Sequence, residues 1–366
     1  MSTGSSQAAV PVKVAILGAG SIAFANAVVL SHRGHAVSLW SPSGEGTAGL
    51  TDGRLEYTGA LVGTARVTVV SAIDTAIAGA EVVIISLPAY GHAGVMRAMA
   101  PHVRADQSVL VMPTLSLGSL YLAKLLHARG VHTPIAGFGT TVMTARKTGP
   151  ASVNLISLRS RLDIAALPAR DTPAMQSLAT ALFGDVFSAQ SDALAVALVN
   201  VNPISHVPLA LANLTRIEKG QVWTQYDHMT GAVARMIGAI DIERLRVAAA
   251  LGLTVRSIEE HFHLSFGVPM TDLGSQAQMV HDRLGSPAGP VSLNSRYFTE
   301  DVPYGLAFYG AIGRMAGVAT PALDACVVLA GAACGCDFAT SNELADSIGL
   351  AQLTPATLRA LVRDGY

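Results

Sequence analysis

The segment VKVAILGAGSIAFANAVVLSHRG, residues 12–34, determines how the amino-terminal half folds. An apolar run is followed directly by the pattern G-x-G-x-x-A, formed by Gly18, Gly20 and Ala23, and then by an alanine-rich helical pattern. In a strand, turn and helix of this kind, the first glycine permits a tight turn and the second lets the backbone approach a pyrophosphate. The small third residue allows the helix to pack closely on the strand. We therefore predict a dinucleotide-binding turn.

The residues around this turn bear on the choice of cofactor. The predicted helix begins at Ser21 and Ile22, where its N-terminus would hold the phosphates. The next strand, HAVSLW, is followed by SPSGEG, where an acidic residue would accept hydrogen bonds from the ribose of NAD and repel a 2′-phosphate. Here Ser41 and Ser43 can hydrogen-bond either group, and Glu45 comes a few residues late. The pattern leaves NADP and NAD open and favours NADP.

Three further apolar runs, EVVIISLPAYG, SVLVMPT and TPIAGFGTT, alternate with helical patterns and predict a parallel, doubly wound sheet. Ligands of such sheets bind beyond the carboxyl ends of the strands, so we expect Leu87, Pro88 and Thr114 to line the cofactor site. His92 is expected to be a surface residue at a helix start. Two strands in SVNLISLRSRLDIAALPA, a helix and a last strand in VFSAQ should close the domain near Ser188.

Length and composition bound the remaining organisation. A chain of 366 residues exceeds what one hydrophobic core usually serves, so we expect two domains. We predict a disordered tail over residues 1–11, a Rossmann domain over 12–188 and an α-helical substrate domain over 189–366. Lys plus Arg number 24 against 25 Asp plus Glu, which offers no footprint for nucleic acid or a membrane surface. Charged residues make up only 13%, which favours a homo-oligomer such as a dimer.

Apolar stretches and cysteines add two expectations. No apolar run reaches the roughly 20 residues that a membrane-spanning helix needs, and the first ten residues lack the features of a signal peptide. The three cysteines, Cys326, Cys334 and Cys336, lack a partner set with metal-ligand spacing. We therefore expect a cytoplasmic protein without a metal site.

The segment VNVNPISHVPLALANLTRIEKG, residues 199–220, is apolar enough for a core helix, yet it carries Asn202, His206 and Asn213 at offsets of four and seven. Those offsets place the three polar side chains on one helical face. Two prolines interrupt regular turns, so we expect the helix to kink or restart near His206. Two interpretations remain open here: a core histidine beside packing amides, or a polar face that lines a cleft.

A second motif, NSRYFTEDVPYGL followed by GVATPALD, places Arg296, Glu300 and Asp301 just before an apolar helix. Together with the glycine-rich turn and NPISHVP, it resembles the opine dehydrogenase family, of the octopine/nopaline type, over nearly the full length. The resemblance implies a Rossmann domain joined to a helical domain. It also implies an enzyme that joins an amino acid to a 2-keto acid such as pyruvate and reduces the resulting imine with NAD(P)H.

The resemblance places the family's catalytic histidine on His206, its partner carboxylate on Asp301 and its substrate-carboxylate arginine on Arg296. These residue types suit those roles. Imidazole transfers protons near neutral pH, a carboxylate on its other nitrogen fixes the tautomer, and a guanidinium grips a carboxylate through two hydrogen bonds. We expect Asn202 to orient substrate, whereas Asn213 is either functional or structural.

Two alternatives remain. A two-domain reductase of the ketopantoate or 3-hydroxyacid type would reduce a carbonyl without condensing an amine; such enzymes rely on a lysine in the second domain, for which Lys219 is the candidate. A non-catalytic NAD(P)-binding sensor is the alternative from another class. The spacing of residues does not specify which amino acid and keto acid are joined, because the shape of the pocket determines that.

Overall fold

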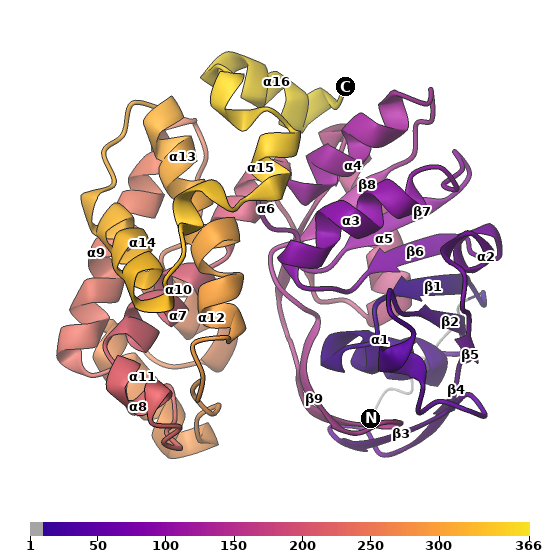
Figure 1. Cartoon of the computed structure of the whole chain (residues 1–366), viewed down its shortest axis with the longest axis horizontal. Helices are drawn as coiled ribbons and strands as arrows, with labels where there is room; N and C mark the ends of the chain where they lie inside the picture. The colour runs from indigo at the N-terminus through magenta and orange to yellow at the C-terminus, as the bar shows by residue number, and fades with distance from the viewer. Residues whose placement is uncertain (1–9) are drawn as a thin grey trace, which may run out of the picture.

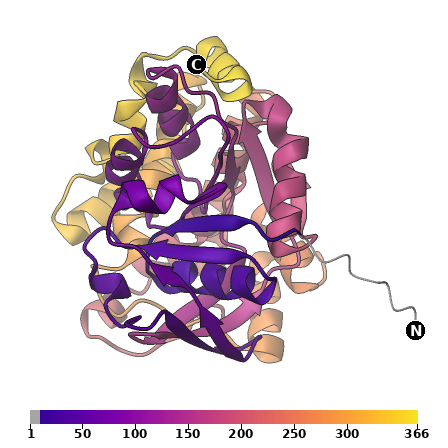
Figure 2. The same ribbon diagram turned by 90° about the vertical axis from the view of Figure 1, so that its right-hand side faces the viewer.

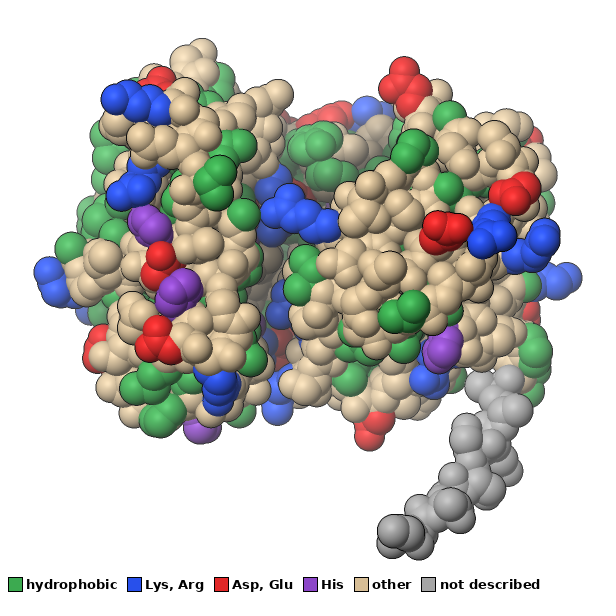
Figure 3. All heavy atoms as spheres, turned by 90° about the horizontal axis from the view of Figure 1, so that it is seen from below, with side chains coloured by type: hydrophobic (Ala, Val, Ile, Leu, Met, Phe, Trp, Pro, Cys, Tyr) green, Lys and Arg blue, Asp and Glu red, His purple; other side chains and the backbone are tan. Residues whose placement is uncertain are grey.

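The computed structural model describes residues 10–366, so most of the tail predicted over residues 1–11 lies outside the described residues. Figure 1 shows an α/β lobe and a helical lobe side by side. Seen from below, the space-filling view shows a groove between the two lobes, with Lys and Arg side chains along it (Figure 3). The predicted fold class, a Rossmann-like lobe followed by a helical lobe, is confirmed.

An eight-stranded sheet forms the centre of the α/β lobe, in the order β12-β11-β8-β7-β6-β1-β2-β5. Its neighbouring strands run parallel except for the pair β8 and β11. That pair is antiparallel because the chain between them forms two further strands and no crossover helix. The strands are β1 (Lys13–Leu17), β2 (Ala36–Trp40), β5 (Thr68–Val69), β6 (Val82–Ile85), β7 (Ser108–Val111), β8 (Ile135–Phe138), β11 (Leu162–Leu167) and β12 (Phe187–Ala189).

A second, four-stranded sheet was not predicted. Its order is β4-β3-β10-β9, and it packs against helix α1 (Ser21–His32) on the side opposite β1 and β2, as Figure 2 shows. The helix is covered on both sides, which explains why its sequence is apolar all round. Both strands predicted in SVNLISLRSRLDIAALPA therefore form, but β10 belongs to this small sheet and β11 to the main sheet. The strands are β3 (Arg54–Gly59), β4 (Gly63–Arg66), β9 (Met143–Gly149) and β10 (Ser152–Leu158).

The helices of the α/β lobe connect the parallel strands, as the alternating pattern predicted. Each of the helical patterns read after EVVIIS, SVLVMPT and RLDIAALPA forms a helix. Buried residues of α3 and α4 join the large core that also contains residues of the helical lobe. One hydrophobic core therefore extends across both lobes, and a second one lies within the α/β lobe. The helices are α2 (Ile73–Ala78), α3 (Ala89–Met99), α4 (Gly118–His127) and α5 (Thr172–Phe183).

The helical lobe begins with a broken helix whose second half carries His206. Helix α6 (Ala193–Val199) is followed by Asn200 and Val201, and α7 (Asn202–Leu211) begins directly after them. The predicted restart is present, but it lies at Asn202, a full turn before His206. Pro203 lies in the first turn of α7, where a helix needs no backbone donor. Together, α6 and α7 (Ala193–Leu211) have the length and hydropathy of a membrane-spanning helix, but 89% of this segment is buried inside the protein.

The remaining helices complete this lobe and then return to the first. Helices α15 and α16 pack on the α/β lobe (Figure 1), where Arg97 pairs with Glu343 and Lys124 Nζ donates to Ser347 O at 2.8 Å. The elements are α8 (Leu214–Glu218), α9 (Gly231–Ala250), α10 (Ile258–Phe266), α11 (Leu273–Leu284), α12 (Arg296–Thr299), the π-helix η3 (Val302–Ala307), α13 (Phe308–Met315), α14 (Pro321–Cys334), α15 (Glu343–Ser347) and α16 (Pro355–Asp364).

Candidate active site

The glycine-rich turn between β1 and α1 has the geometry of a phosphate site. Gly18 has φ +140°, and a Cβ atom there would lie 2.2 Å from the carbonyl oxygen of Ser86, so only glycine fits. Gly20 differs, because no atom lies within 4 Å of the place where its Cβ would be. Helix α1 begins at Ser21 without a side-chain cap, which leaves its first N–H groups to a ligand. The open space and the free donors fit a dinucleotide pyrophosphate.

The rim of this turn contains a positive charge that the sequence did not predict. Lys147, on β9, places its Nζ 3.3 Å from Ala19 O and 3.1 Å from Gly46 O. Its backbone N–H donates to Ser21 Oγ. No local pattern could have identified this lysine, because only the small sheet brings β9 to the turn. The ammonium group therefore supplies a cation where the sequence after β2 offers none.

The other predicted cofactor residues differ in accessibility. Ser41 is buried beside the turn, whereas Ser43 is exposed and its Oγ accepts the N–H of Glu45. Leu87 and Pro88 are half-buried at the carboxyl end of β6, as expected. Ile22 is half-buried and Ala23 is fully buried in the first turn of α1. Thr114 is 1% exposed and its Oγ1 has no hydrogen-bond partner among the described residues, so it is covered in this structure.

His92 is not at the surface, so its predicted place is wrong. It is fully buried on α3, and its Nε2 lies 2.9 Å from Leu87 O. A Cβ atom at Gly118 would lie 3.5 Å from His92 Nδ1 and 3.6 Å from Leu344 Cδ1, so the packing of α4 and α15 on α3 covers this histidine. Burial lowers the pKa of His92 to about 4, partly offset by the hydrogen bond to Leu87.

This burial predicts a pH dependence of stability. The pKa of His92 is about 4 in the folded protein and 6.5 in the unfolded chain, so its contribution is complete above pH 6.5 and is lost as the pH falls towards 4. The shift corresponds to about 3 kcal/mol. Thermal unfolding above pH 6.5 and near pH 4 should therefore show a larger loss of apparent stability for the wild type than for His92→Gln. Equal losses would contradict this assignment.

His206 and Asp301 lie together, although 95 positions separate them. The distance from His206 Nδ1 to Asp301 Oδ2 is 2.8 Å, and both residues are buried. The ring of Tyr297 is parallel to the imidazole, with centroids 4.0 Å apart. Burial lowers the pKa of His206, against the raising effect of Asp301, so the neutral form is favoured in the free protein. With Nδ1 bound to the carboxylate, Nε2 is the nitrogen left for a ligand.

The segment that carries Asp301 is fixed from both lobes. It enters the π-helix η3, where Leu306 N–H donates to Asp301 O. From the α/β lobe, Ser116 Oγ donates to Tyr304 O at 2.7 Å, and Asn342 bridges Ser116 and Pro303 O. Such π-turns frequently occur at functional sites. The contacts hold Asp301 at a constant position relative to both lobes.

Gly305 explains why the motif contains glycine at this place. A Cβ atom there would lie 2.3 Å from the Cγ of Pro203, so η3 and α7 can approach each other only at glycine. This approach brings the NPISHVP and EDVPYGL motifs into contact and places His206 beside Asp301. The two motifs on which the resemblance depends are therefore adjacent in space.

Arg296 and Glu300 lie next to the dyad on the groove side. The Arg296 side chain is 53% exposed, and its Nη1 is 3.8 Å from Glu300 Oε2. Glu300 is buried, and its other oxygen accepts the N–H of Ala89 across the lobes. Burial, and then the charge of Asp301, raise the pKa of Glu300 to about 7. Arg296 is thus held only loosely and remains accessible to a ligand carboxylate.

The two asparagines that flank His206 have different surroundings. Asn202 is half-buried and lines a small cavity with Thr140, Arg159, Arg256 and other residues. Asn213 is buried where α8 begins, and its Nδ2 donates to Leu209 O at 2.9 Å. The face predicted from the spacing does not continue to Asn213 because α7 ends at Leu211. Asn213 therefore serves the helix junction and does not line the groove.

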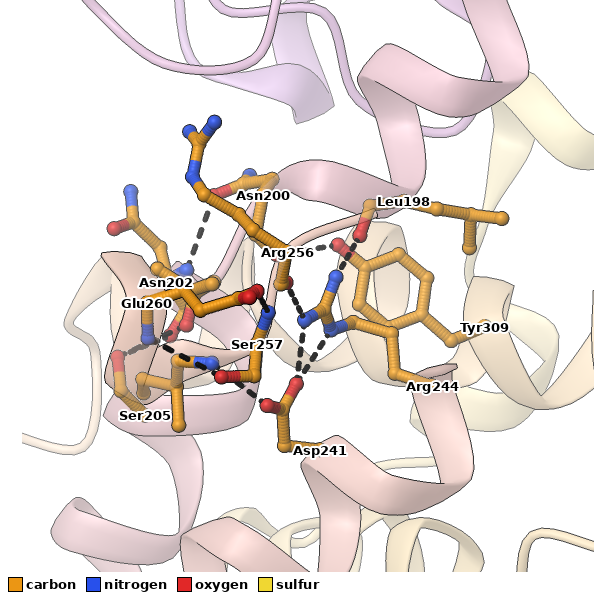
Figure 4. Close-up of polar contacts among 12 residues, drawn as sticks. Leu198, Asn200, Asn202, Ser205, Asp241, Arg244, Arg256, Ser257, Glu260 and Tyr309 are labelled. Carbon is orange, nitrogen blue, oxygen red and sulfur yellow. Dashed lines mark hydrogen bonds and ion pairs between the residues drawn. The ribbon is translucent and has the colours of Figure 1, made fainter. Parts of the chain in front are cut away.

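A buried charge network rigidifies the break between α6 and α7 (Figure 4). Arg244 on α9 is fully buried, pairs with Asp241 and donates to the carbonyl of Leu198. The hydroxyl of Tyr309 donates to Asn200 O at 2.8 Å. Helix ends that are fixed in this way hold the following helix, so the network positions Asn202 and His206. Sequence reasoning missed these residues because their spacing contains no recognisable motif.

A larger cavity adjoins the small one. It has a volume of about 450 Å³ and shares Val199 and Arg256 with the cavity beside Asn202. Because the two cavities share these residues, they lie side by side. It is lined by Arg161, Gln190, Val199, Thr254, Val255, Arg256, Glu260, His263, Leu264 and Met270.

Comparisons with known proteins agree with this geometry. Residues 189–334 match the sequence model for the NAD/NADP octopine/nopaline dehydrogenase α-helical domain, and residues 13–114 match that for the NAD-dependent glycerol-3-phosphate dehydrogenase N-terminus. An opine dehydrogenase of Arthrobacter sp. (strain 1C) is 29% identical over 359 residues, which cover 95% of this chain and 98% of that protein.

Solved structures show the same fold. An octopine dehydrogenase described with NADH and L-arginine has a TM-score of 0.79 at 20% identity, covering 96% of this chain and 98% of its own. A yersinopine dehydrogenase with bound NADP⁺ has a TM-score of 0.76 at 15% identity, covering 96% of this chain and 99% of its own.

Proposed function

Because the chain belongs to the opine dehydrogenase family, we propose that it joins the amine of an amino acid to the carbonyl of a 2-keto acid and reduces the product. The balanced reaction converts amino acid, 2-keto acid, NAD(P)H and a proton into an N-(carboxyalkyl)amino acid, NAD(P)⁺ and water. The enzyme is thus an NAD(P)-dependent oxidoreductase acting on a CH–NH group. The observation that carries the proposal is the His206–Asp301 pair, at 2.8 Å, in a chain that also has the dinucleotide turn.

The dyad suits the proton transfers of condensation. A neutral His206 can accept a proton through Nε2 when the amine nitrogen attacks the keto carbon. It can pass that proton to the former carbonyl oxygen, which becomes the hydroxyl of the carbinolamine. A second proton, taken up from solvent through the same imidazole, lets this hydroxyl leave as water and leaves a protonated imine, the species that hydride reduces. Asp301 stabilises the imidazolium that forms in between and keeps Nδ1 protonated.

The remaining predicted residues bind and orient the reactants. Arg296, exposed beside the dyad, would hold the keto-acid carboxylate through its guanidinium. Asn202 would orient substrate from the first turn of α7, one helical turn before His206. The N–H groups at Ser21 and Ile22 would hold the cofactor phosphates, and Leu87 and Pro88 would line the nicotinamide side. The reduced nicotinamide supplies the hydride.

A matrix of amino acids and 2-keto acids tests this function. Consumption of NAD(P)H should require both reactants at once, because reduction follows condensation. Steady consumption with a keto acid alone would instead support the ketopantoate reductase type of reaction. Lys219, the lysine on which that alternative depends, is exposed and directly follows α8 at the lower end of the helical lobe (Figure 1). A protein that binds the cofactor and turns over no pair would support the sensor.

For the cofactor, we expect NADPH to be used at least as well as NADH. Ser41 and Ser43 bring no negative charge to the end of β2, and Lys147 adds a cation at the neighbouring turn. A positive charge favours an additional phosphate group. The ratio of kcat/KM for the two cofactors measures this preference. A strong preference for NADH would show that Glu45 or a backbone contact discriminates against the phosphate.

We also propose a homodimer in the cytoplasm. Support for a dimer comes from the low content of charge and from Val328 and Leu329, which are exposed on α14. Light scattering should then give twice the chain mass of 37.7 kDa. A monomer at micromolar concentration would contradict the dimer, and recovery of the native protein outside the cytoplasm would contradict the location.

A further inference from the structure

Arg159 is one of the residues that line the small cavity beside Asn202. It lies between β10 and β11, where its backbone N–H donates to Val142 O at 3.0 Å. Its Nε donates to Thr141 O at 2.8 Å. Two contacts from the β9 side therefore fix the backbone and the arm of the side chain. The terminal nitrogens, which form the fork of the guanidinium, remain for another partner.

Among the described residues, Arg159 has no carboxylate partner, whereas the arginines near it each have one. Arg256 pairs with Asp163, and the guanidinium of Arg244 pairs with Asp241. Arg296 has Glu300 at 3.8 Å. Among residues 10–366, no carboxylate lies within 4.0 Å of Arg159. Burial lowers the pKa of Arg159; the Tyr226 hydroxyl opposes this shift, and the positive charges of Arg296 and Arg256 add to it. A bound anionic ligand would therefore relieve an excess of positive charge.

The place of Arg159 also distinguishes between the two reactants. It lines the same small cavity as Asn202, and that cavity adjoins the larger one of about 450 Å³. A pyruvate-like keto acid has no side chain that needs such a volume, whereas an amino acid does. Arg296, by contrast, lies on the segment that ends in Asp301, next to the dyad that must act on the keto carbon.

We propose that Arg159 binds the α-carboxylate of the amino acid, while Arg296 binds the carboxylate of the keto acid. The inference rests on the proposed function and deepens it, because the condensation product carries two carboxylates. It restricts the amine substrate to α-amino acids whose side chain enters the larger cavity. Amines without a carboxylate are then poor substrates, since they leave the Arg159 guanidinium without an anion.

The test compares single variants against both reactants. Arg159→Ala should raise the KM for the amino acid about 10- to 100-fold, the range for a charged hydrogen-bonded contact, and leave the KM for the keto acid near wild type. Arg296→Ala should do the reverse. Arg159→Lys should recover part of the loss, because it keeps the charge and loses the fork. Arg54→Gln, at an exposed position on β3, serves as the matched control.

A decarboxylated amine provides the decisive comparison. With the amine that corresponds to the best amino acid, Arg159→Ala and wild type should have similar kcat/KM, because the group that Arg159 binds is absent. Calorimetric titration with NADPH should show unchanged affinity, which excludes general misfolding. An equal loss with both amines, or a raised KM for the keto acid, would overturn the assignment while the wild type still condenses its substrates. A wild type that forms no secondary amine would overturn the proposed function and this assignment with it.

Discussion

Replacing His206 with alanine is expected to lower kcat by about 10²–10⁴-fold, the usual range for a positioned acid–base group, while cofactor affinity stays near wild type. The imidazole held by Asp301 can accept the amine proton and pass it to the oxygen of the carbinolamine. Asp301→Asn should be nearly as damaging, because an amide does not stabilise the imidazolium and does not enforce the required tautomer.

The double variant separates a dyad from two independent residues. If His206 and Asp301 act as one unit, His206→Ala combined with Asp301→Asn should be little slower than His206→Ala alone, whereas independent contributions would multiply. Lys219→Ala is the control, since this exposed lysine should not affect turnover. A near wild-type kcat for His206→Ala would mean that His206 is a packed core histidine, and a large loss for Lys219→Ala would favour the carbonyl reductase.

Gly20→Asp is expected to abolish cofactor binding and leave the fold largely intact. The space around the Gly20 Cβ position is open in this structure, so a side chain fits without displacing protein atoms. The same side chain would occupy the approach of the pyrophosphate and repel it by charge. Calorimetric titration with NADPH and NADH measures the loss.

Gly18→Ala is the matched comparison, because it should act in the opposite way. Its Cβ would lie 2.2 Å from Ser86 O and its φ of +140° disfavours any side chain, so this change should lower the melting temperature. Unchanged affinity of Gly20→Asp for both cofactors would remove the dinucleotide assignment from this turn.

The parts of the site that were predictable carry a local signal. The glycine-rich turn places its three small residues within six positions, so its geometry follows from the sequence. The pairing of His206 with Asp301 was predicted differently: the resemblance supplied it, and the close approach of α7 and η3 at Gly305 produces it. Contacts that depend on long-range packing gave no such signal.

The residues that the sequence did not reveal, and the predictions that were wrong, have the same origin in long-range packing. Lys147 and Arg159 reach the site through the small sheet, whose strands β3 and β10 pair across almost one hundred residues. His92 followed a proline at a helix start, which is typical of a surface position, but α4 and α15 pack over it. For Asn213, the helical spacing was correct only as long as one helix continued, and α7 ends two residues earlier. Local patterns predict elements well; the packing of distant elements decides which side chains meet.

The reaction product tests the central claim most directly. Wild-type protein would be incubated with NADPH, a 2-keto acid and an amino acid that together consume the cofactor, and the products would be identified by mass spectrometry. We predict a secondary amine whose mass equals that of both reactants, minus water and plus two hydrogens, formed in equal amount to the NADPH consumed. Formation of the 2-hydroxy acid in that amount, with the amino acid recovered unchanged, would contradict the account.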